Sequence, residues 1–412
     1  MKLHNGTLYW PTTLTEEFSV KTSKQSKKQY DAIVIGGGMS GCLVAYKLLK
    51  QGLSVAILEK GNFGQGSTAA NTGLLQYSND IMLSELIQEI GEEDAIRFYQ
   101  LCYEALDDIE QIANELPHKV DFVRRPSIYY ASDNADVNKL RTEYETLYMN
   151  NFPCEFWNES TLSFYMPFKK PAAIVTFQDA EINPLKFITS LLIYLQEHGV
   201  DLFDQTVVSH TTYENQLIHL QTNRQSFRAK DVIYTIGYEK NQNAKKEDTI
   251  FNRSYVMVTK PIHSVTHWHN QAMIWETKRP YLYLRTTAEG AIMVGGMDEN
   301  VPKEQVDENV IKECAEKLLK ETKLLFPNLE LEVDCCYAAT FAETKDLLPF
   351  IGAHPTKPHH YYLLGYGGNG TVYSVLGAKI ISDLIAGKEN NDAHIVSPKR
   401  KDSDNQSFSS IA

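Results

Sequence analysis

The sequence predicts an α/β fold, α+β overall, in which a parallel sheet carries an inserted antiparallel sheet. Three observations predict it. Residues 31–60 have the pattern of a buried strand, a glycine-rich turn, a helix and a second buried strand. Residues 361–387 repeat the order of strand, glycine-rich turn and helix near the other end of the chain. Between them, residues 254–299 contain alternating apolar and polar side chains, as in strands with one buried face.

The first unit carries a glycine pattern that is typical of dinucleotide binding. Its turn, G-G-G-M-S-G, covers residues 36–41 and opens the helix. In this pattern Gly36 permits the tight turn, Gly38 leaves room for a pyrophosphate, and Gly41 lets helix and strand pack closely. Glu59 ends the second strand, where an acid accepts hydrogen bonds from an adenosine ribose. The unit predicts a Rossmann-like domain, and the alternative is a structural turn that is merely rich in glycine.

Two later segments are candidates to complete the same site. Residues 64–73, G-Q-G-S-T-A-A-N-T-G, could press amides and hydroxyls against a phosphate or ribityl chain, or could form a surface loop. The strand at 231–236 ends on Gly237, which a two-lobed nucleotide-binding sheet would place near the ligand. A plain strand-ending glycine is the alternative there.

The last glycine-rich turn, G-Y-G-G-N-G at residues 365–370, precedes a predicted helix over 371–386. A helix start offers unpaired N–H groups and the positive end of a dipole to an anion. Two such helix starts at opposite ends of the chain predict one extended ligand that is held at both ends. A dinucleotide fits that description.

The middle of the chain predicts helices at 83–116, 185–197 and 310–326, with short strands from 120 to 177 and from 200 to 236. In the run Y-L-Y-L-R, side chains Tyr281, Tyr283 and Arg285 share one face of a strand, and residues 292–296 form the return strand of a hairpin. This face is predicted to be a pocket wall; the alternative is a solvated polar surface.

Bulk composition narrows the function. The formal net charge is −12 over 412 residues, which argues against a nucleic-acid partner. No apolar run approaches the length of a membrane span. The six cysteines have neither metal-binding spacing nor a disulfide framework, so we expect no metal site and a cytoplasmic location.

Together these motifs resemble the FAD-dependent oxidoreductases of the D-amino-acid oxidase superfamily, which includes glycine oxidase and gamma-glutamylputrescine oxidase. The resemblance covers roughly residues 30–390. Its motifs, in chain order, are I-V-I-G-G-G-M-S-G with Glu59, G-S-T-A-A-N-T-G, V-I-Y-T-I-G, Y-L-Y-L-R-T-T, E-T-K-D-L-L-P-F-I-G and G-Y-G-G-N-G.

The resemblance implies an FAD that is held at three places along the chain. Its ADP half would contact Gly36, Gly38, Gly41, Glu59 and Lys60, with Val208 against the adenine and Gly237 close by. Ser67, Thr68, Asn71 and Thr72 would line the pyrophosphate and ribityl region, and Gly367, Gly368, Asn369, Gly370 and Thr371 would face the pyrimidine edge of the flavin. Cys335 and Cys336 lie upstream of the place where relatives attach flavin covalently, so non-covalent FAD is expected.

The resemblance also implies a substrate: a small amine or amino acid whose C–N bond is oxidised, with oxygen or another electron acceptor. The arginine that binds the substrate carboxylate in glycine oxidase has no counterpart, because counting back five residues from Asp346 gives Phe341. Arg285 is therefore the first candidate for pairing with a carboxylate, and a structural arginine bracing the hairpin is the alternative. Tyr283 and Tyr255 are expected to shape the same site.

The predicted organisation is discontinuous. Residues 30–116, 180–250 and 336–390 form the FAD-binding domain, 117–179 and 251–335 the substrate domain, 1–29 a polar lead-in and 391–412 a flexible tail. Two other functions stay open: a non-catalytic or electron-relay FAD subunit of a larger complex, and a nicotinamide-dependent reductase.

Overall fold

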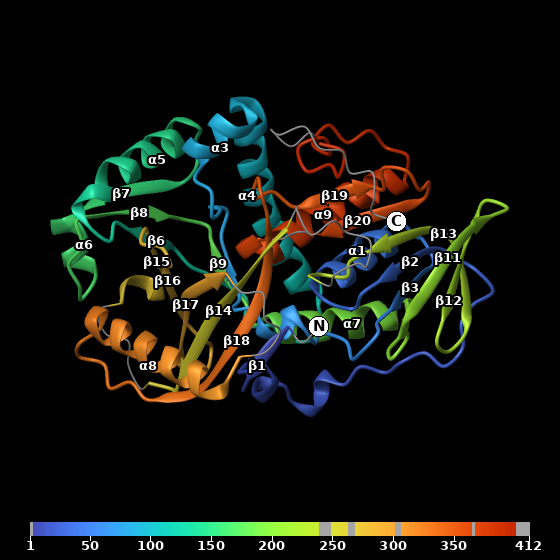
Figure 1. The fold of residues 1–412 in the computed structure, drawn as a ribbon, viewed down its shortest axis with the longest axis horizontal. Coiled ribbons are helices and arrows are strands. Elements are labelled where there is room, and N and C mark those ends of the chain that lie inside the picture. The colour runs from blue at the N-terminus through green and yellow to red at the C-terminus, as the bar shows by residue number, and fades with distance from the viewer. Residues whose placement is uncertain (1–2, 239–248, 263–267, 301–305, 365–366, 401–412) are drawn as a thin grey trace.

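The computed structural model describes residues 3–238, 249–262, 268–300, 306–364 and 367–400. It confirms a mixed α/β fold with two large sheets, which lie in different halves of the molecule (Figure 1). The helices of the described residues are α1 (Met39–Lys50), α2 (Ser67–Ala70), α3 (Leu83–Ile90), α4 (Glu92–Glu115), α5 (Val137–Met149), α6 (Glu159–Tyr165), α7 (Pro184–Glu197), α8 (Glu308–Leu325) and α9 (Gly370–Ile385).

The first sheet is built on parallel strands. Its order is β10 (Asp201–Phe203), β3 (Val55–Leu58), β2 (Tyr30–Ile35), β13 (Ser226–Tyr234), β12 (Leu217–Thr222) and β11 (Val208–Glu214), with β20 (His360–Leu364) beside β13 and β19 (Phe350–Ala353) beside β20. Strand β2 is parallel to both β3 and β13. The carboxyl ends of these strands therefore meet at one edge, where ligands bind in such sheets.

Strands β2 and β3 are covered on both faces, which explains their continuous apolar sequence. Ala32 and Val34 of β2 face a core shared with α1, α4, α7 and α9. The intervening Ile33 faces a second core with Ile218 and Leu220 of β12. Helix α7 begins one residue before the predicted residue 185, and the side chain of Asn183 accepts hydrogen bonds from the backbone N–H groups of Leu185 and Lys186.

The second sheet has nine strands and is mainly antiparallel. Its order is β1 (His4–Gly6), β18 (Val333–Thr344), β14 (Thr249–Thr259), β17 (Ile292–Asn300), β16 (Leu282–Thr286), β15 (Met273–Glu276), β6 (Ser127–Tyr130), β8 (Ala172–Thr176) and β7 (Cys154–Asn158). Helix α8 packs on one face, where Leu282 and Leu284 contribute to a core with Ile311 and Leu318 (Figure 1). The opposite face, which carries Tyr283, is turned toward the parallel half.

A small third sheet consists of β4 (Leu74–Leu75), β9 (Ala180–Glu181) and β5 (Val123–Arg124). Its strands join segments from both halves of the expected domain division. Strand β4 follows the small-residue loop of the parallel half, and β5 precedes the strands that enter the nine-stranded sheet. This sheet therefore links the two halves of the molecule.

Several predicted bounds need correction. The helical region 83–116 is two helices, because Gly91 has φ +91° and separates α3 from α4. The expected domain bound at residue 336 falls inside β18, which pairs with β14 along its length and so belongs to the nine-stranded sheet. The expected flexible tail is packed over 391–400, where Ile395 and Val396 are buried; residues 401–412 lie outside the described part.

The expected polar lead-in is also more than a lead-in. Strand β1 pairs with β18, and Trp10 is only 1% exposed. The indole N–H of Trp10 donates a hydrogen bond to the carbonyl oxygen of Asn71 at 2.6 Å. Residues 4–10 therefore hold the small-residue loop 64–73 in place through Trp10.

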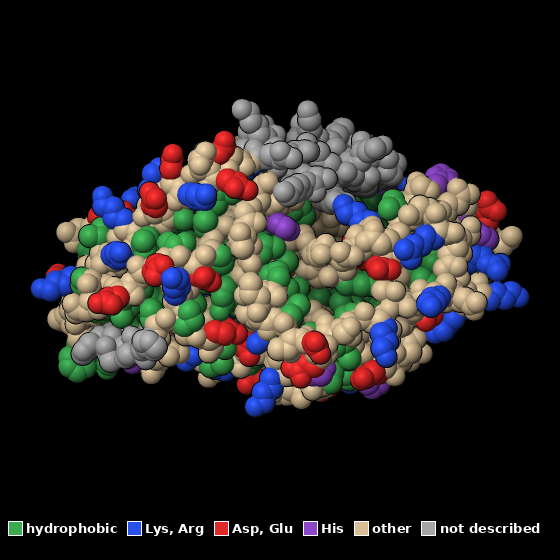
Figure 2. All heavy atoms as spheres, turned by 90° about the horizontal axis from the view of Figure 1, so that it is seen from below, with side chains coloured by type: hydrophobic (Ala, Val, Ile, Leu, Met, Phe, Trp, Pro, Cys, Tyr) green, Lys and Arg blue, Asp and Glu red, His purple; other side chains and the backbone are tan. Residues whose placement is uncertain are grey.

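The surface carries charges of both signs. On the face in Figure 2, basic and acidic side chains are interspersed and form no large patch of one sign. None of the helices in the described ranges has the length and apolar character that a membrane crossing needs. The cysteines are free thiols, and the cytoplasmic location stays a prediction.

Replacing Trp10 by Ala should destabilise the whole fold. Removing a fully buried indole costs about 3–5 kcal/mol in the free energy of unfolding, and here the Asn71 carbonyl also loses its donor. Urea unfolding followed by circular dichroism measures the change. Trp10→Phe, which keeps most of the buried surface, should lose less than half as much; equal losses would show that the indole N–H, not its burial, dominates.

Candidate active site

A long cavity of about 470 Å³ lies at the carboxyl edge of the parallel sheet. It runs from the β2–α1 turn and the end of β3 to the start of α9. The predicted cofactor residues among its lining are Gly36, Gly38, Glu59, Lys60, Ser67, Thr68, Asn71, Val208, Gly237, Gly370 and Thr371. Residues that are 335 positions apart in the chain thus line one space, as the hypothesis of an extended ligand requires.

The turn after β2 can be formed only by glycine at two positions. A Cβ on Gly41 would lie 1.9 Å from the carbonyl oxygen of Gly36. Gly36 itself has φ +113°, and a Cβ there would lie 2.4 Å from the carbonyl oxygen of Thr235. The hydroxyl of Thr235 lies 2.9 Å from the Ile35 carbonyl oxygen and 3.1 Å from that of Gly36. The end of β13 therefore fixes the turn, and the predicted role of Gly41 in close packing is confirmed.

Glu59 is held rigidly at the end of β3. One of its carboxylate oxygens accepts a hydrogen bond from the Gly37 N–H at 2.7 Å, and the other accepts one from the Gly61 N–H at 2.7 Å. These two bonds orient the carboxylate at the wall of the long cavity, beside Lys60. An acceptor that is fixed in this way suits a ribose hydroxyl.

The two helix starts are bonded to each other across the cavity. The hydroxyls of Ser40 in α1 and Ser374 in α9 lie 2.8 Å apart. The side-chain amide of Asn71 donates to the hydroxyl of Thr371 at 3.0 Å. The hydroxyl of Ser67, beside them, is buried and has no hydrogen-bond partner within the described protein. An unpaired buried hydroxyl on a cavity wall fits a polar ligand, because such groups are otherwise costly.

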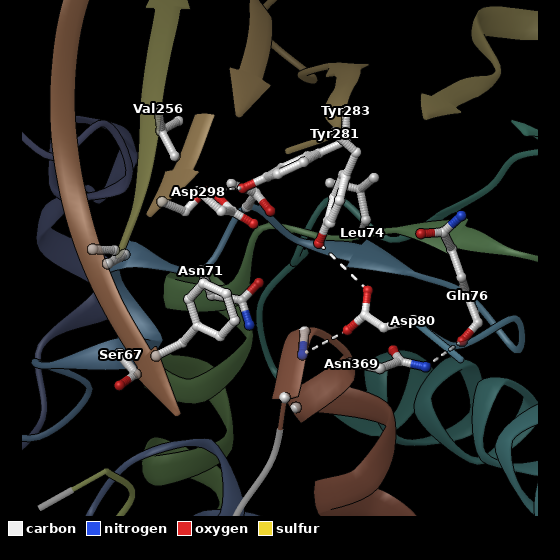
Figure 3. Close-up of a pocket in the computed structure, with 18 of the residues that line it drawn as sticks. Ser67, Asn71, Leu74, Gln76, Asp80, Val256, Tyr281, Tyr283, Asp298 and Asn369 are labelled. Atoms are coloured by element: carbon white, nitrogen blue, oxygen red, sulfur yellow. Dashed lines mark hydrogen bonds between the residues drawn. The ribbon is translucent and has the colours of Figure 1, made fainter. Parts of the chain in front are cut away.

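A second cavity of about 180 Å³ adjoins the first; residues that line it are drawn in Figure 3. The two share Ser67, Asn71, Tyr238 and Gly370. The second lies between the start of α9 and the free face of the nine-stranded sheet. Its remaining walls include Thr72, Leu74, Gln76, Asp80, Val256, Trp275, Tyr281, Tyr283, Asp298, Phe341, Gly367, Gly368 and Asn369.

The side chain of Asp80 lies next to Gly368, in the turn that precedes α9. One carboxylate oxygen accepts a hydrogen bond from the Gly368 N–H at 3.1 Å, and the other accepts one from the Tyr281 hydroxyl at 3.4 Å (Figure 3). Burial raises the pKa of the Asp80 carboxyl above its ordinary value, although the Gly368 N–H and the charge of Arg279 act in the opposite direction. Asn369 is tied to the same loop by its hydrogen bond to the Gln76 carbonyl at 2.8 Å.

A β-bulge brings Asp298 into the second cavity. Arg253 of β14 pairs with Glu299 of β17, but Tyr255, two residues on, pairs with Gly296, three residues back, so β17 has one extra residue. Met297 in the bulge has φ +56°, which is uncommon outside glycine. The extra residue turns Asp298 toward the cavity and Glu299 to the other face. Burial raises the pKa of the Asp298 carboxyl to about 6.

The three predicted catalytic residues have different outcomes. Tyr283 lines the second cavity, 3.5 Å from the Ser254 hydroxyl, and burial raises its pKa to about 12. Tyr255 is a correction: Ser254 and Val256 face the cavity, so Tyr255 between them faces the α8 side, where its hydroxyl bonds to Glu299.

Arg285 is also a correction. Its guanidinium is 1% exposed, lines neither cavity, and donates to the carbonyl oxygens of Gly73 at 2.6 Å, Ile182 at 2.9 Å and Thr286 at 2.8 Å. The alternative of a structural arginine is therefore favoured. The sequence indicated which face of the strand it occupies, but not that this face extends past the cavity to the β4–β9 sheet.

Of the predicted cofactor residues, all except Gly41 line one of the two cavities. Sequence reasoning missed Asp80, Asp298 and Gln76. Asp80 lies in an irregular loop that gives no periodic signal. Strict alternation along β17 would have placed Asp298 on the wrong face, so only the bulge reveals it.

The turn before α1 and the start of α9 line one long cavity at the edge of a parallel sheet. This arrangement is typical of dinucleotide-binding proteins. A family model described as FAD dependent oxidoreductase (DAO) matches residues 31–384. The chain therefore belongs to the DAO family of FAD-dependent oxidoreductases, and its cofactor is FAD.

Individual relatives are distant. Glycine oxidase of Bacillus subtilis is 24% identical over 381 residues, which are 89% of this chain and 95% of that protein. A putative Rieske 2Fe-2S iron-sulfur protein of the same organism, YhfW, is 21% identical over 95% of this chain and 75% of its own length. The crystal structure of glycine oxidase from Geobacillus kaustophilus matches with a TM-score of 0.77 at 18% identity, over 91% of this chain and 100% of that chain.

Replacing Gly41 by Ala should abolish flavin binding. The new Cβ would overlap the Gly36 carbonyl, so the turn that borders the long cavity must open. The measure is the ratio of flavin to protein absorbance after purification, expected to fall more than about tenfold, because a displacement of this size removes the fit to the pyrophosphate. Gly52→Ala is the control: φ is +80° but no atom lies within 4 Å, so it should lower stability and leave flavin content unchanged.

Replacing Gly295 by Ala should displace Tyr283 without loss of FAD. A Cβ on Gly295 would lie 2.1 Å from the Tyr283 ring, so the ring must leave its place on the wall of the second cavity. We expect flavin content to be unchanged and flavin reduction by substrate to slow by roughly a hundredfold, since a shift of about 1 Å suffices for that. Unchanged reduction would show that Tyr283 does not position the substrate.

Proposed function

We propose that this chain oxidises the C–N bond of a small amine or amino acid. One observation carries the proposal: the long cavity, whose lining would hold FAD, shares wall residues with a smaller, partly aromatic cavity beside the start of α9. A substrate in the smaller cavity would lie against one end of the cofactor. The relatives that are named glycine oxidases support this class of substrate.

The protein would hold FAD without a covalent bond, because no cysteine is among the described residues that line either cavity. Gly36, Gly38 and Glu59 would hold the adenosine end, and Ser67 would give its unpaired hydroxyl to the middle. A bound FAD would supply a hydride acceptor for the carbon next to a neutral amine nitrogen; loss of the hydride leaves an iminium ion, whose N–H proton goes to water to give the imine. The start of α9 would stabilise negative charge at the flavin end of the cofactor.

The smaller cavity would orient the substrate and exclude water. Trp275, Tyr281, Tyr283 and Phe341 supply most of its aromatic surface. The Tyr283 hydroxyl, whose pKa burial raises to about 12, is protonated at neutral pH and can donate a hydrogen bond. Correct placement of the reacting carbon is the main contribution of these walls to the rate.

The electron acceptor after the reaction is either oxygen or a second protein. The similarity to YhfW, which is named as an iron-sulfur protein, favours keeping an electron-relay role as the second candidate. The two are distinguished by reoxidation. An oxidase forms hydrogen peroxide in proportion to the amine consumed, whereas a relay protein reoxidises slowly in air and rapidly with an artificial one-electron acceptor.

An anaerobic panel tests the proposed function. The purified holoenzyme is mixed with amines and amino acids, and the flavin absorbance is followed. At least one C–N substrate should bleach the flavin within seconds to minutes, as the adjoining cavities predict. If dithionite reduces the flavin but no amine or amino acid does, the proposed reaction is wrong and the relay role gains support.

A further inference from the structure

The smaller cavity has an unusual charge balance for a site that would take an amino acid. Among its described lining residues, Asp80 and Asp298 are acidic, and there is no lysine, arginine or histidine. Phe341 occupies the wall at the position where an arginine was expected from the resemblance. A substrate carboxylate would therefore meet two carboxyl groups and an aromatic ring.

The nearby arginines, Arg279 and Arg285, bond to other groups of the protein. Arg279 lowers the pKa of both carboxyls by its charge, but its guanidinium lies 4.8 Å from the centre of the Tyr281 ring and donates to the Glu276 carbonyl at 3.3 Å. Arg285 is bonded to three backbone carbonyls. Neither guanidinium is directed at a substrate in the smaller cavity.

One oxygen of the Asp298 carboxyl lacks a hydrogen-bond partner. The Ser254 side chain bonds to the Asp298 carboxyl, but the oxygen Oδ1 of that carboxyl is buried and has no hydrogen-bond partner in the described protein, whereas buried polar atoms are normally paired. The bulge that places it there keeps Met297 at φ +56°, a conformation that costs free energy for a side chain of this size. Figure 3 shows Asp80, Tyr281, Tyr283 and Asp298 around the same space. These observations point to a cationic ligand group.

We infer that Asp298, assisted by Asp80, binds a positively charged nitrogen of the substrate. The nitrogen at the reacting carbon must be neutral to give up hydride next to it, so the bound cation is a second nitrogen. The substrate class is then an aliphatic diamine or polyamine without a carboxylate near the reacting end. This inference rests on the proposed function, because it assigns the substrate of the same cavity.

The inference predicts a definite pH dependence. Burial raises the pKa of Asp298 to about 6. Glu343 of β18, which accepts a hydrogen bond from the Asn252 side chain and is not among the residues that line the smaller cavity, has its pKa raised to about 7 by burial and by the charges of Asp80 and Asp298. The other groups that act on these two carboxyls are Asp80, which raises their pKa, and Arg279, Ser254 and Asn252, which lower it. A cation binds the deprotonated carboxylates, so its affinity should rise from about pH 5 to about pH 8.

The experiment uses ligands that cannot be oxidised. The first probe is an aliphatic diamine in which each carbon bearing nitrogen carries two methyl groups, so it has no hydrogen to lose. The matched monoamine and aminoisobutyrate, an amino acid with the same feature, are the comparison ligands. Dissociation constants are measured from shifts in the flavin spectrum and by calorimetry, on holoenzyme of the wild type, Asp298→Asn, Asp80→Asn and Glu299→Gln.

The wild type should bind the diamine at least about tenfold more tightly than the monoamine or aminoisobutyrate, and Asp298→Asn should weaken diamine binding by roughly tenfold to a hundredfold. Monoamine binding should weaken less than diamine binding, because the monoamine has no second nitrogen to place at Asp298 while the first lies at the flavin. Glu299→Gln removes a charge one residue away on the opposite face and should leave the preference intact. If Asp298→Asn does not fold, Asp80→Asn provides the same comparison with a smaller loss.

Two outcomes overturn the inference: a preference for the diamine that survives both Asp→Asn changes, or tighter binding of aminoisobutyrate than of the diamine. Its failure can be told apart from failure of the proposed function. If amino acids bleach the flavin and the diamine preference is absent, the reaction stands and the inference falls. If no amine bleaches the flavin but diamine binding still depends on Asp298, the recognition stands and the reaction falls.

Discussion

The close contact between Gly36 and Gly41 is the constraint on which the rest of the site depends. With no Cβ at either position, α1 can start directly on the end of β2, and the Thr235 hydroxyl can bond to the turn from β13. This geometry brings Ser40 within hydrogen-bond distance of Ser374 in α9. The late helix start is therefore positioned by the early one, and both border the same cavity. A side chain at position 41 would separate them and would change the cavity along its length.

A second constraint is the register of the nine-stranded sheet. Regular alternation places Leu282 and Leu284 on the α8 side and leaves Tyr283 for the cavity. The bulge in β17 breaks this alternation at one place only, and the result is an exchange of Asp298 for Glu299 on the cavity face. The inserted residue thus decides which of two neighbouring carboxylates, Asp298 or Glu299, faces the smaller cavity. Bulges often redirect side chains next to active sites in this way.

The predicted cofactor residues, apart from Gly41, line the two cavities, and the sequence could indicate them because their signals are local. A glycine turn between a strand and a helix, or an acid at a strand end, implies the same geometry wherever it occurs. The substrate half depends on pairing between distant strands, which a sequence pattern does not encode. Tyr255 and Arg285 were assigned from residue type and face, but the register of β14 and the reach of Arg285 to Gly73 decided their roles. Asp80 was missed because its position depends on the Gly368 N–H, 288 residues away.

The buried arginine beside this site has a structural role, whereas the acidic residues face the cavity. The cation of Arg285 is buried where it bonds to the Gly73 and Ile182 carbonyls and lies 3.7 Å from the carboxylate of Glu181, so it joins the small third sheet to β16. A guanidinium so bonded is too costly to release for a ligand. The carboxyls of Asp80 and Asp298 face a cavity, where a ligand can reach them. A scaffold that uses its arginine for structure and leaves acids at the site can select a substrate by positive charge, although its fold is shared with glycine oxidase.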